Sequence, residues 1–189
     1  SLLILIENKS IEGIILIGEG RTFFAGADIS EFGKPMLGPD LNEVINTFEE
    51  STKPVVAALH GTPLGGGLEL AMGCNYRVAL NSTKLGLPEV TLGIIPGAGG
   101  TQRLPRLAGV EKSLSMITSG RPINAKESLK FNIVEEIYED ALLANTLNFI
   151  KTKISKQSHP KTRDLNEKIS NIDNSIFDKF NEQIKKKFR

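Results

Sequence analysis

The sequence of 189 residues is long enough for one domain with a sizeable core and short for two. Its 23 Lys and Arg residues nearly balance 22 Asp and Glu residues, so the overall charge gives no support to nucleic-acid or membrane-surface binding. The single cysteine, Cys74, excludes an internal disulfide and a cysteine-cluster metal site, and it favours a reducing, intracellular compartment. Interrupted apolar runs predict neither a membrane span nor a signal peptide.

Strand and helix patterns alternate along the first half of the chain. Three short apolar runs predict buried strands, at residues 14–17, 54–59 and 76–80. Apolar residues at helical spacing from Leu41 to Phe48 predict a helix, and Asp40 with Glu43 predicts a capping box at its start. A short helix that opens on glycine is predicted over residues 67–73. This order predicts an α/β fold with a mostly parallel sheet and packed helices.

The second half of the chain is predicted to be mainly helical. A helix capped by Asn124, with Glu127 three residues on, is predicted to run to Phe131, and Asn132 stands where a left-handed terminating residue is expected. From Leu165 onward, apolar residues recur near every 3.6 positions and predict a further helix. We therefore expect a C-terminal helical region, which is basic because residues 151–189 carry a net charge of +6.

Three segments are richer in glycine and small residues than packing requires: residues 24–28, 61–69 and 86–103. Glycine between a strand and a helix lets backbone N–H groups face a ligand, and the helix N-terminus adds partial positive charge, so such a turn can hold an oxyanion. A dinucleotide fingerprint does not fit, because Gln102 stands where its third glycine would be. A P-loop does not fit either, since no Gly-Lys-Ser/Thr follows. For any one segment alone, a tight turn remains the simpler interpretation.

Glu69 and Glu89 lie in or beside these segments, each flanked by apolar residues. A carboxyl group in such surroundings tends to have a raised pKa, which suits general acid–base work near neutral pH. Either glutamate alone would be interpreted as an ordinary surface residue, but two beside anion-binding turns favour a site. His60 and His159 have no matched nucleophile or ligand set nearby in sequence, so no metal site is predicted.

From Ile14 to about Val134 the sequence resembles the crotonase (enoyl-CoA hydratase/isomerase) superfamily. The resemblance is carried by residues 24–28 (FAGAD), 65–71 (GGGLELA) and 88–104 (PEVTLGIIPGAGGTQRL). Residues 73–77, 86–90 and 117–120 are most similar to the N-terminal half of bifunctional enzymes that also carry a 3-hydroxyacyl-CoA dehydrogenase. The resemblance implies a crotonase-type (ClpP/crotonase) fold, with residues 1–135 as the core and 136–189 as a C-terminal helical region. It also implies a further N-terminal strand pair and a CoA-binding basic residue, which we expect ahead of Ser1.

The resemblance also implies roles for individual residues. The thioester carbonyl of an acyl-CoA would lie between the backbone N–H groups of Ala27 and Gly66, which form an oxyanion hole for the enolate. Glu69 would orient and deprotonate the water that attacks C3, and Glu89 would exchange the proton at C2. The implied substrate contacts are Ala25, Ala27, Asp28, Ile29 and Gly66. No cofactor is implied, because CoA is part of the substrate.

The function implied is hydration of trans-2-enoyl-CoA to 3-hydroxyacyl-CoA in fatty-acid β-oxidation, with double-bond isomerisation as a side activity. A 3-enoyl-CoA isomerase, or another acyl-CoA lyase or hydrolase on the same fold, is the first alternative. A non-catalytic acyl-CoA or nucleic-acid binding module is another, which the acid pair disfavours. The expected partner is the acyl-CoA substrate, with neither nucleic acid nor membrane. A trimeric or hexameric homo-oligomer and a parent chain with a dehydrogenase half stay open. The expected location is cytoplasmic, with a peroxisomal or mitochondrial origin left open.

Overall fold

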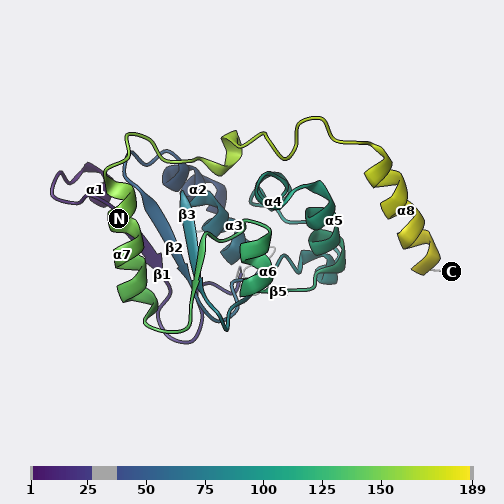
Figure 1. Cartoon of the computed structure of the whole chain (residues 1–189), viewed down its shortest axis with the longest axis horizontal. Helices are drawn as coiled ribbons and strands as arrows, with labels where there is room; N and C mark the ends of the chain where they lie inside the picture. Colours follow the sequence, from purple (N-terminus) through teal and green to yellow (C-terminus); the bar gives the residue numbers. More distant parts are fainter. Residues whose placement is uncertain (1, 27–37, 188–189) are drawn as a thin grey trace.

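The structure is a computed structural model that describes residues 2–26 and 38–187 (Figure 1). Its centre is a sheet of four parallel strands in the spatial order β1-β2-β3-β6, and β4 and β5 form a separate antiparallel ribbon. The elements in chain order are α1 (Leu2–Glu7), β1 (Ile14–Ile17), α2 (Leu41–Glu49), β2 (Val55–Leu59), α3 (Gly66–Gly73), β3 (Tyr76–Leu80), β4 (Lys84–Leu85), the 3-10 helix η2 (Glu89–Leu92), α4 (Gly100–Ala108), α5 (Val110–Ser119), β5 (Ile123–Asn124), α6 (Ala125–Lys130), β6 (Glu136–Tyr138), α7 (Leu142–Ile154), the 3-10 helix η3 (Thr162–Asp164) and α8 (Ser175–Lys187).

The three strands predicted from apolar runs are present and pair in parallel, as expected for a β/α alternation. Every residue of β2 is buried, because β2 has a strand on each side and helices on both faces. Burial on both faces is wrong for β1, where Ile17 is 37% exposed, because β1 has only β2 as a neighbour among the described residues. The short polar strand β6 was not predicted, and it pairs with β3.

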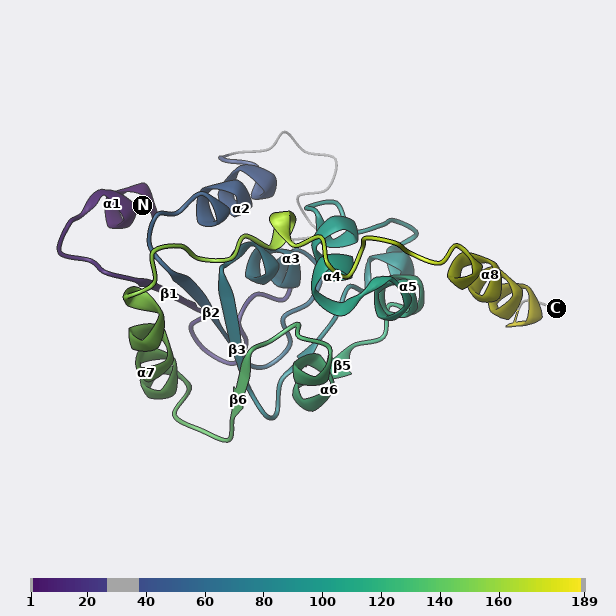
Figure 2. The same ribbon diagram turned by 45° about the horizontal axis from the view of Figure 1, so that its top comes forward.

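Helices cover both faces of the sheet, and alternate side chains of β2 pack into apolar clusters on opposite faces. Val55, Ala57 and Leu59 face the larger apolar cluster, which includes residues of α2, α3 and α4. Val56 and Ala58 face a second cluster with α7. Figure 2 shows α2 and α3 on one side of the sheet and α7 on the other. The buried helix α3, which follows β2 in the chain, therefore packs on the face of the sheet that carries Val55, Ala57 and Leu59.

The two predicted helix caps are present. Asp40 and Glu43 form the reciprocal capping box of α2. The side chain of Asn124 accepts the N–H of Glu127 at 2.8 Å at the start of α6. Asn132 has a φ of 58°, as expected for a left-handed residue just past that helix. These local signals correctly gave the starts of both helices.

The C-terminal helix begins later than the prediction from Leu165. α8 starts at Ser175, whose N–H donates to the side chain of Asp173 at 2.9 Å. The residues before it are rich in Asn, Asp and Ser, which bond to nearby backbone and favour turns, and Asn171 has a φ of 58°. Figure 1 shows α8 beyond α5, away from the sheet. β6 is a strand of the sheet and α7 packs on it, although both come from the region 136–189. The domain boundary at residue 135 stays a prediction.

Across residues 2–26 and 38–187, no helix combines the length and apolar character needed to cross a membrane.

Candidate active site

The loop after β2 brings α3 against the first glycine segment. Gly65 precedes α3 with φ 54° and ψ −129°, a conformation open to glycine because a Cβ would be strained there. A Cβ at Gly67 would overlap the carbonyl oxygen of Phe24, so only glycine allows this close approach. The N-terminus of α3 therefore lies beside residues 24–26, as the two glycine motifs require if they share a site.

Glu69, in the first turn of α3, is 3% exposed and is held by the third glycine segment. Its Oε1 accepts the backbone N–H of Ala98 at 2.8 Å and of Gly100 at 2.7 Å. A Cβ at Gly100 would lie 2.9 Å from the same oxygen, so glycine makes room for the carboxylate. The turn that leads into α4 thus holds an anion, as its glycines indicated, but that anion is the protein's own side chain.

Glu89 begins η2, after the short strand β4. Its Oε2 is buried and has no hydrogen-bond partner among the residues that the structure describes. Its Oε1 lies beside Gly65, where an added Cβ would be 3.2 Å away. A buried carboxyl oxygen without a partner is costly in a folded protein and indicates a place for a ligand or a transferable proton.

Both glutamates line one cavity of about 490 Å³. Ala25 and Gly66 line it too, at the N-terminal end of α3. Its wall also has an apolar portion formed by Leu41, Leu92, Ile94 and Ile95. A larger cavity of about 660 Å³, between α5 and the segment 168–176, is lined by neither glutamate. Paired carboxyl groups, glycine N–H groups and an apolar wall suit a ligand with an acyl chain and a polar reacting group.

Burial raises the pKa of both carboxyl groups above the usual range for glutamate. For Glu69 the N–H groups of Gly100 and Ala98, and then the charge of Arg103, partly oppose this rise by stabilising the ionised form. For Glu89 burial is again the main cause, and the nearby charge of Glu69 raises the pKa further. Two neighbouring acids with raised pKa values are suited to proton transfer near neutral pH.

The structure brings together the described members of the predicted site: Glu69, Glu89, Gly66 and Ala25. Ala27, Asp28 and Ile29 lie outside the described residues, so their predicted oxyanion-hole and substrate contacts stay predictions. Within residues 2–26 and 38–187, no group of three or more His, Cys, Asp or Glu is arranged to hold a metal ion.

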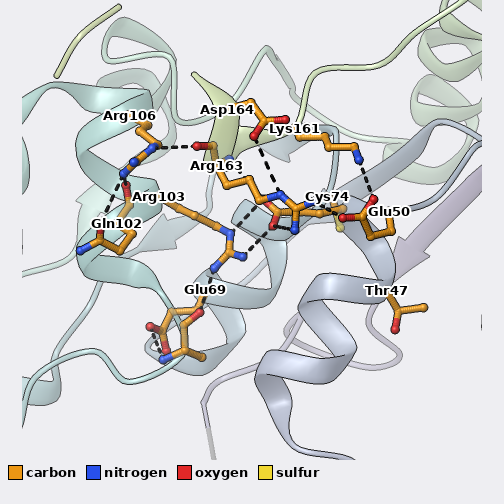
Figure 3. Close-up of polar contacts among 12 residues, drawn as sticks. Thr47, Glu50, Glu69, Cys74, Gln102, Arg103, Arg106, Lys161, Arg163 and Asp164 are labelled. Carbon is orange, nitrogen blue, oxygen red and sulfur yellow. Dashed lines mark hydrogen bonds and ion pairs between the residues drawn. The ribbon is translucent and has the colours of Figure 1, made fainter. Parts of the chain in front are cut away.

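Sequence reasoning missed a buried ion pair that contacts the turn holding Glu69. Glu49 of α2 is fully buried and pairs with Arg103 of α4 at 2.7 Å. A signal was present, because Glu49 stands four residues after Ile45, on the face of α2 that is otherwise apolar. A charge at that position indicates either an error in the helix prediction or a buried partner. Figure 3 shows Arg103 between Glu69 and the cluster of Glu50, Lys161 and Arg163.

A family model for enoyl-CoA hydratase/isomerase matches residues 1–185. The chain belongs to the enoyl-CoA hydratase/isomerase family. Among curated relatives of this family member, the peroxisomal bifunctional enzyme of Danio rerio is 45% identical over 151 residues, which is 80% of this chain and 21% of the relative. A probable enoyl-CoA hydratase of Bacillus subtilis (strain 168) is 50% identical over 134 residues, covering 67% of this chain and 52% of the relative. The chain thus spans about a fifth to a half of these relatives.

Solved structures of the same family share the fold. The enoyl-CoA hydratase of Bacillus anthracis superposes with a TM-score of 0.72 at 38% sequence identity, covering 82% of this chain and 62% of that one. The likeness confirms the predicted crotonase-type α/β fold, with its parallel sheet and packed helices.

Proposed function

We propose that this chain hydrates trans-2-enoyl-CoA thioesters to 3-hydroxyacyl-CoA in fatty-acid β-oxidation. The observation that carries the proposal is the pair of glutamates, Glu69 and Glu89, that line one cavity at the N-terminus of α3. Membership of the enoyl-CoA hydratase/isomerase family supports it, as do relatives named enoyl-CoA hydratase and peroxisomal bifunctional enzyme.

The geometry suggests a division of labour between the two acids. Glu69 Oε1 is occupied by two backbone N–H groups, so its Oε2 is the oxygen available to take a proton from water. That water adds its hydroxyl to C3 of the enoyl group, while Glu89 gives a proton to C2. The two steps together add one water, and a proton passed from Glu69 to Glu89 resets the pair.

Charge develops on the thioester oxygen during this addition, because an enolate forms at C1–C2. The N–H of Gly66, at the first position of α3, is proposed as one donor to that oxygen, and the N–H of Ala27 as the other. Within the described part of the chain, Gly65 and Gly67 donate to the carbonyl groups of Gly86 and Leu64, and no acceptor is found for Gly66. The helix N-terminus adds partial positive charge at the same place.

The proposed reaction also indicates which ligands turnover requires. We propose that turnover requires no ligand besides the enoyl-CoA and water, since all the groups used in the proton transfers belong to this chain. A homo-oligomer and a longer parent chain with a dehydrogenase half both stay open, and the relatives named bifunctional enzyme and fatty acid oxidation complex subunit favour the second.

Isomerisation of 3-enoyl-CoA is a second candidate activity. A single acid can carry a proton between C2 and C4, and Glu89 has a buried Oε2 that no described residue binds. Glu69 would have no role in that reaction beyond its charge.

The test compares crotonyl-CoA hydration, followed by loss of the conjugated thioester's ultraviolet absorbance, with 3-enoyl-CoA isomerisation on the same preparation. Hydration above the level of a Glu69→Gln/Glu89→Gln double variant, purified identically, is expected. A wild-type chain that is folded but no faster than this control in hydration would refute the proposed function. Isomerisation without hydration would favour the second candidate.

A further inference from the structure

The ion pair behind Glu69 contacts the turn that holds this glutamate. Arg103 donates from Nε to Glu49 Oε1 at 3.1 Å and from Nη2 to Glu49 Oε2 at 2.7 Å. Its remaining nitrogen, Nη1, donates to the carbonyl oxygen of Ala98 at 3.1 Å. The N–H of Ala98 in turn donates to Glu69 Oε1 at 2.8 Å. One guanidinium therefore connects a buried carboxylate of α2 to Ala98, the residue whose N–H binds Glu69.

The guanidinium is packed directly on this turn. A Cβ at Gly99 would overlap Arg103 Nη1, so the turn and the side chain approach as closely as glycine permits. Gly99 has a φ of 90° and its carbonyl accepts the N–H of Arg103 at 2.8 Å. Arg103 is only 8% exposed, and water does not compete strongly for these bonds. The turn is thus held by a side chain that is not among those lining the cavity.

Glu49 is closed off by a segment distant in sequence. The backbone N–H of Arg163 donates to Glu49 Oε1 at 3.3 Å. The side chains of Lys161 and Arg163 pair with Glu50, the residue after Glu49. The segment around η3 therefore covers the end of α2 and keeps the Glu49–Arg103 pair away from solvent.

We propose that the Glu49–Arg103 pair positions Glu69 by fixing the turn at residues 98–100. The N–H groups of that turn then set the orientation and the proton affinity of the Glu69 carboxylate. The effect on rate rests on the function proposed above, whereas the effect on proton affinity does not. A buried ion pair with a merely structural role would change the stability of the chain and leave the titration of Glu69 unchanged.

Replacement of Arg103 by lysine separates the two roles. The lysine side chain would retain a positive charge opposite Glu49, but a single ammonium lacks the planar fork that bonds both Glu49 and the Ala98 carbonyl. Among the residues that the structure describes, the other charged groups that line the cavity are Glu89 from η2 and Asp40 at the start of α2. With these groups unchanged, a loosened turn stabilises the Glu69 carboxylate less, and the pH midpoint of the Glu69 titration should rise.

The experiment titrates the full chain, with ¹³C-labelled glutamate carboxyl groups, by NMR, and the Glu69 signal is identified by its loss in Glu69→Gln. Arg103→Lys should raise the Glu69 midpoint by about half a pH unit or more. Arg106→Lys is the matched control, because Arg106 lies one turn along α4 and bonds the carbonyl of Arg163 at 3.0 Å and Gln102. Its Glu69 midpoint should stay at the wild-type value.

Kinetics supply the second readout. Arg103→Lys should lower kcat for hydration about tenfold, leave KM within about twofold, and move the acid limb of the kcat profile upward with the NMR midpoint. Arg106→Lys should match the wild type in all three.

An unchanged Glu69 midpoint in folded Arg103→Lys overturns the inference whatever the activity. Expected NMR shifts in a chain that fails to hydrate enoyl-CoA would instead uphold the positioning role and refute the proposed function. If Arg103→Lys does not fold, the double variant Glu49→Gln/Arg103→Gln replaces it, since removing both charges leaves neither one buried alone. An upward shift is expected there too, to which the lost charge of Arg103 also contributes, and its absence is equally decisive against the inference.

Discussion

A methyl group on Gly100 would press on the carboxylate of Glu69 and on the ring of Pro96. Gly100 begins α4 and is not among the glycines with positive φ, so alanine fits the backbone. Its Cβ would lie 2.9 Å from Glu69 Oε1 and 2.9 Å from Pro96 Cβ, closer than such atoms approach in proteins. The carboxylate must move or lose the Gly100 N–H, which now lies 2.7 Å from it.

The size of the effect follows from those contacts. A lost hydrogen bond to a charged, buried group costs about 1.5–3 kcal/mol. Alanine in a helix regains about 0.5–1 kcal/mol, so Gly100→Ala should lower the free energy of unfolding by about 0.5–2.5 kcal/mol. General acid–base catalysis contributes about 10²–10⁴-fold to the rate, and a misplaced base loses much of this contribution. We therefore expect kcat for hydration to fall about 10²-fold. The loss of activity should therefore greatly exceed what partial unfolding explains.

Gly97→Ala is the control for this prediction. Gly97 belongs to the same turn and lines the same cavity, but nothing lies within 4 Å of its added Cβ. Crotonyl-CoA hydration and urea unfolding, measured on both variants, should show near wild-type behaviour for Gly97→Ala. If folded Gly100→Ala turns over within about twofold of the wild type, the position of Glu69 does not limit hydration and the assignment of its role is wrong.

Three other predictions concern the roles of the two glutamates, the oxyanion donor at Gly66, and the dependence of stability on pH. Glu89→Gln should abolish hydration and isomerisation together, whereas Glu69→Gln should damage hydration more, because only hydration activates water; equal losses of both rates in Glu69→Gln would refute this division. Gly66→Val should lower kcat by roughly 10²–10³, on the order of 3 kcal/mol, because the side chain tilts one oxyanion donor. Near wild-type turnover in a folded Gly66→Val chain would place the oxyanion hole elsewhere. Finally, unfolding measured across pH should show Glu89→Gln gaining stability relative to the wild type as the pH rises, and Glu50→Gln losing it.

The parts of the fold set by local chemistry were predictable. The capping residues Asp40 and Asn124 act within three residues of themselves, and the apolar run of β2 needs no partner to be recognised. The placement of Glu69 and Glu89 in one cavity was also predicted, from the motifs around them. Those motifs combine glycine, which permits close backbone approach, with an acid in apolar surroundings.

The parts that depend on distant pairing were not predictable. Glu49 and Arg103 are separated by 54 residues, and neither position alone shows that the other is its partner. β6 has only three residues and two polar or aromatic ones among them, so it forms because β3 offers an open edge. The helix from Leu165 was wrong in its start, because apolar spacing continued through residues whose polar side chains favour turns.

The opposite signs expected for Glu89 and Glu50 follow from how each carboxylate is surrounded. Burial and the charge of Glu69 raise the pKa of Glu89, so the folded chain binds more protons there than the unfolded chain, and stability declines as the pH rises through the folded pKa. Hydrogen bonds from Lys161 and Arg163 lower the pKa of Glu50 to about 2, so its contribution is present above the unfolded value of 4.5 and is lost as the pH falls toward 2. Glutamine does not titrate, so each variant removes the contribution of that carboxyl group to the dependence of folding stability on pH. A pH-independent difference between Glu89→Gln and the wild type would show that Glu89 ionises as easily in the folded chain as in the unfolded one, and the case for it as the proton donor to C2 would then fail.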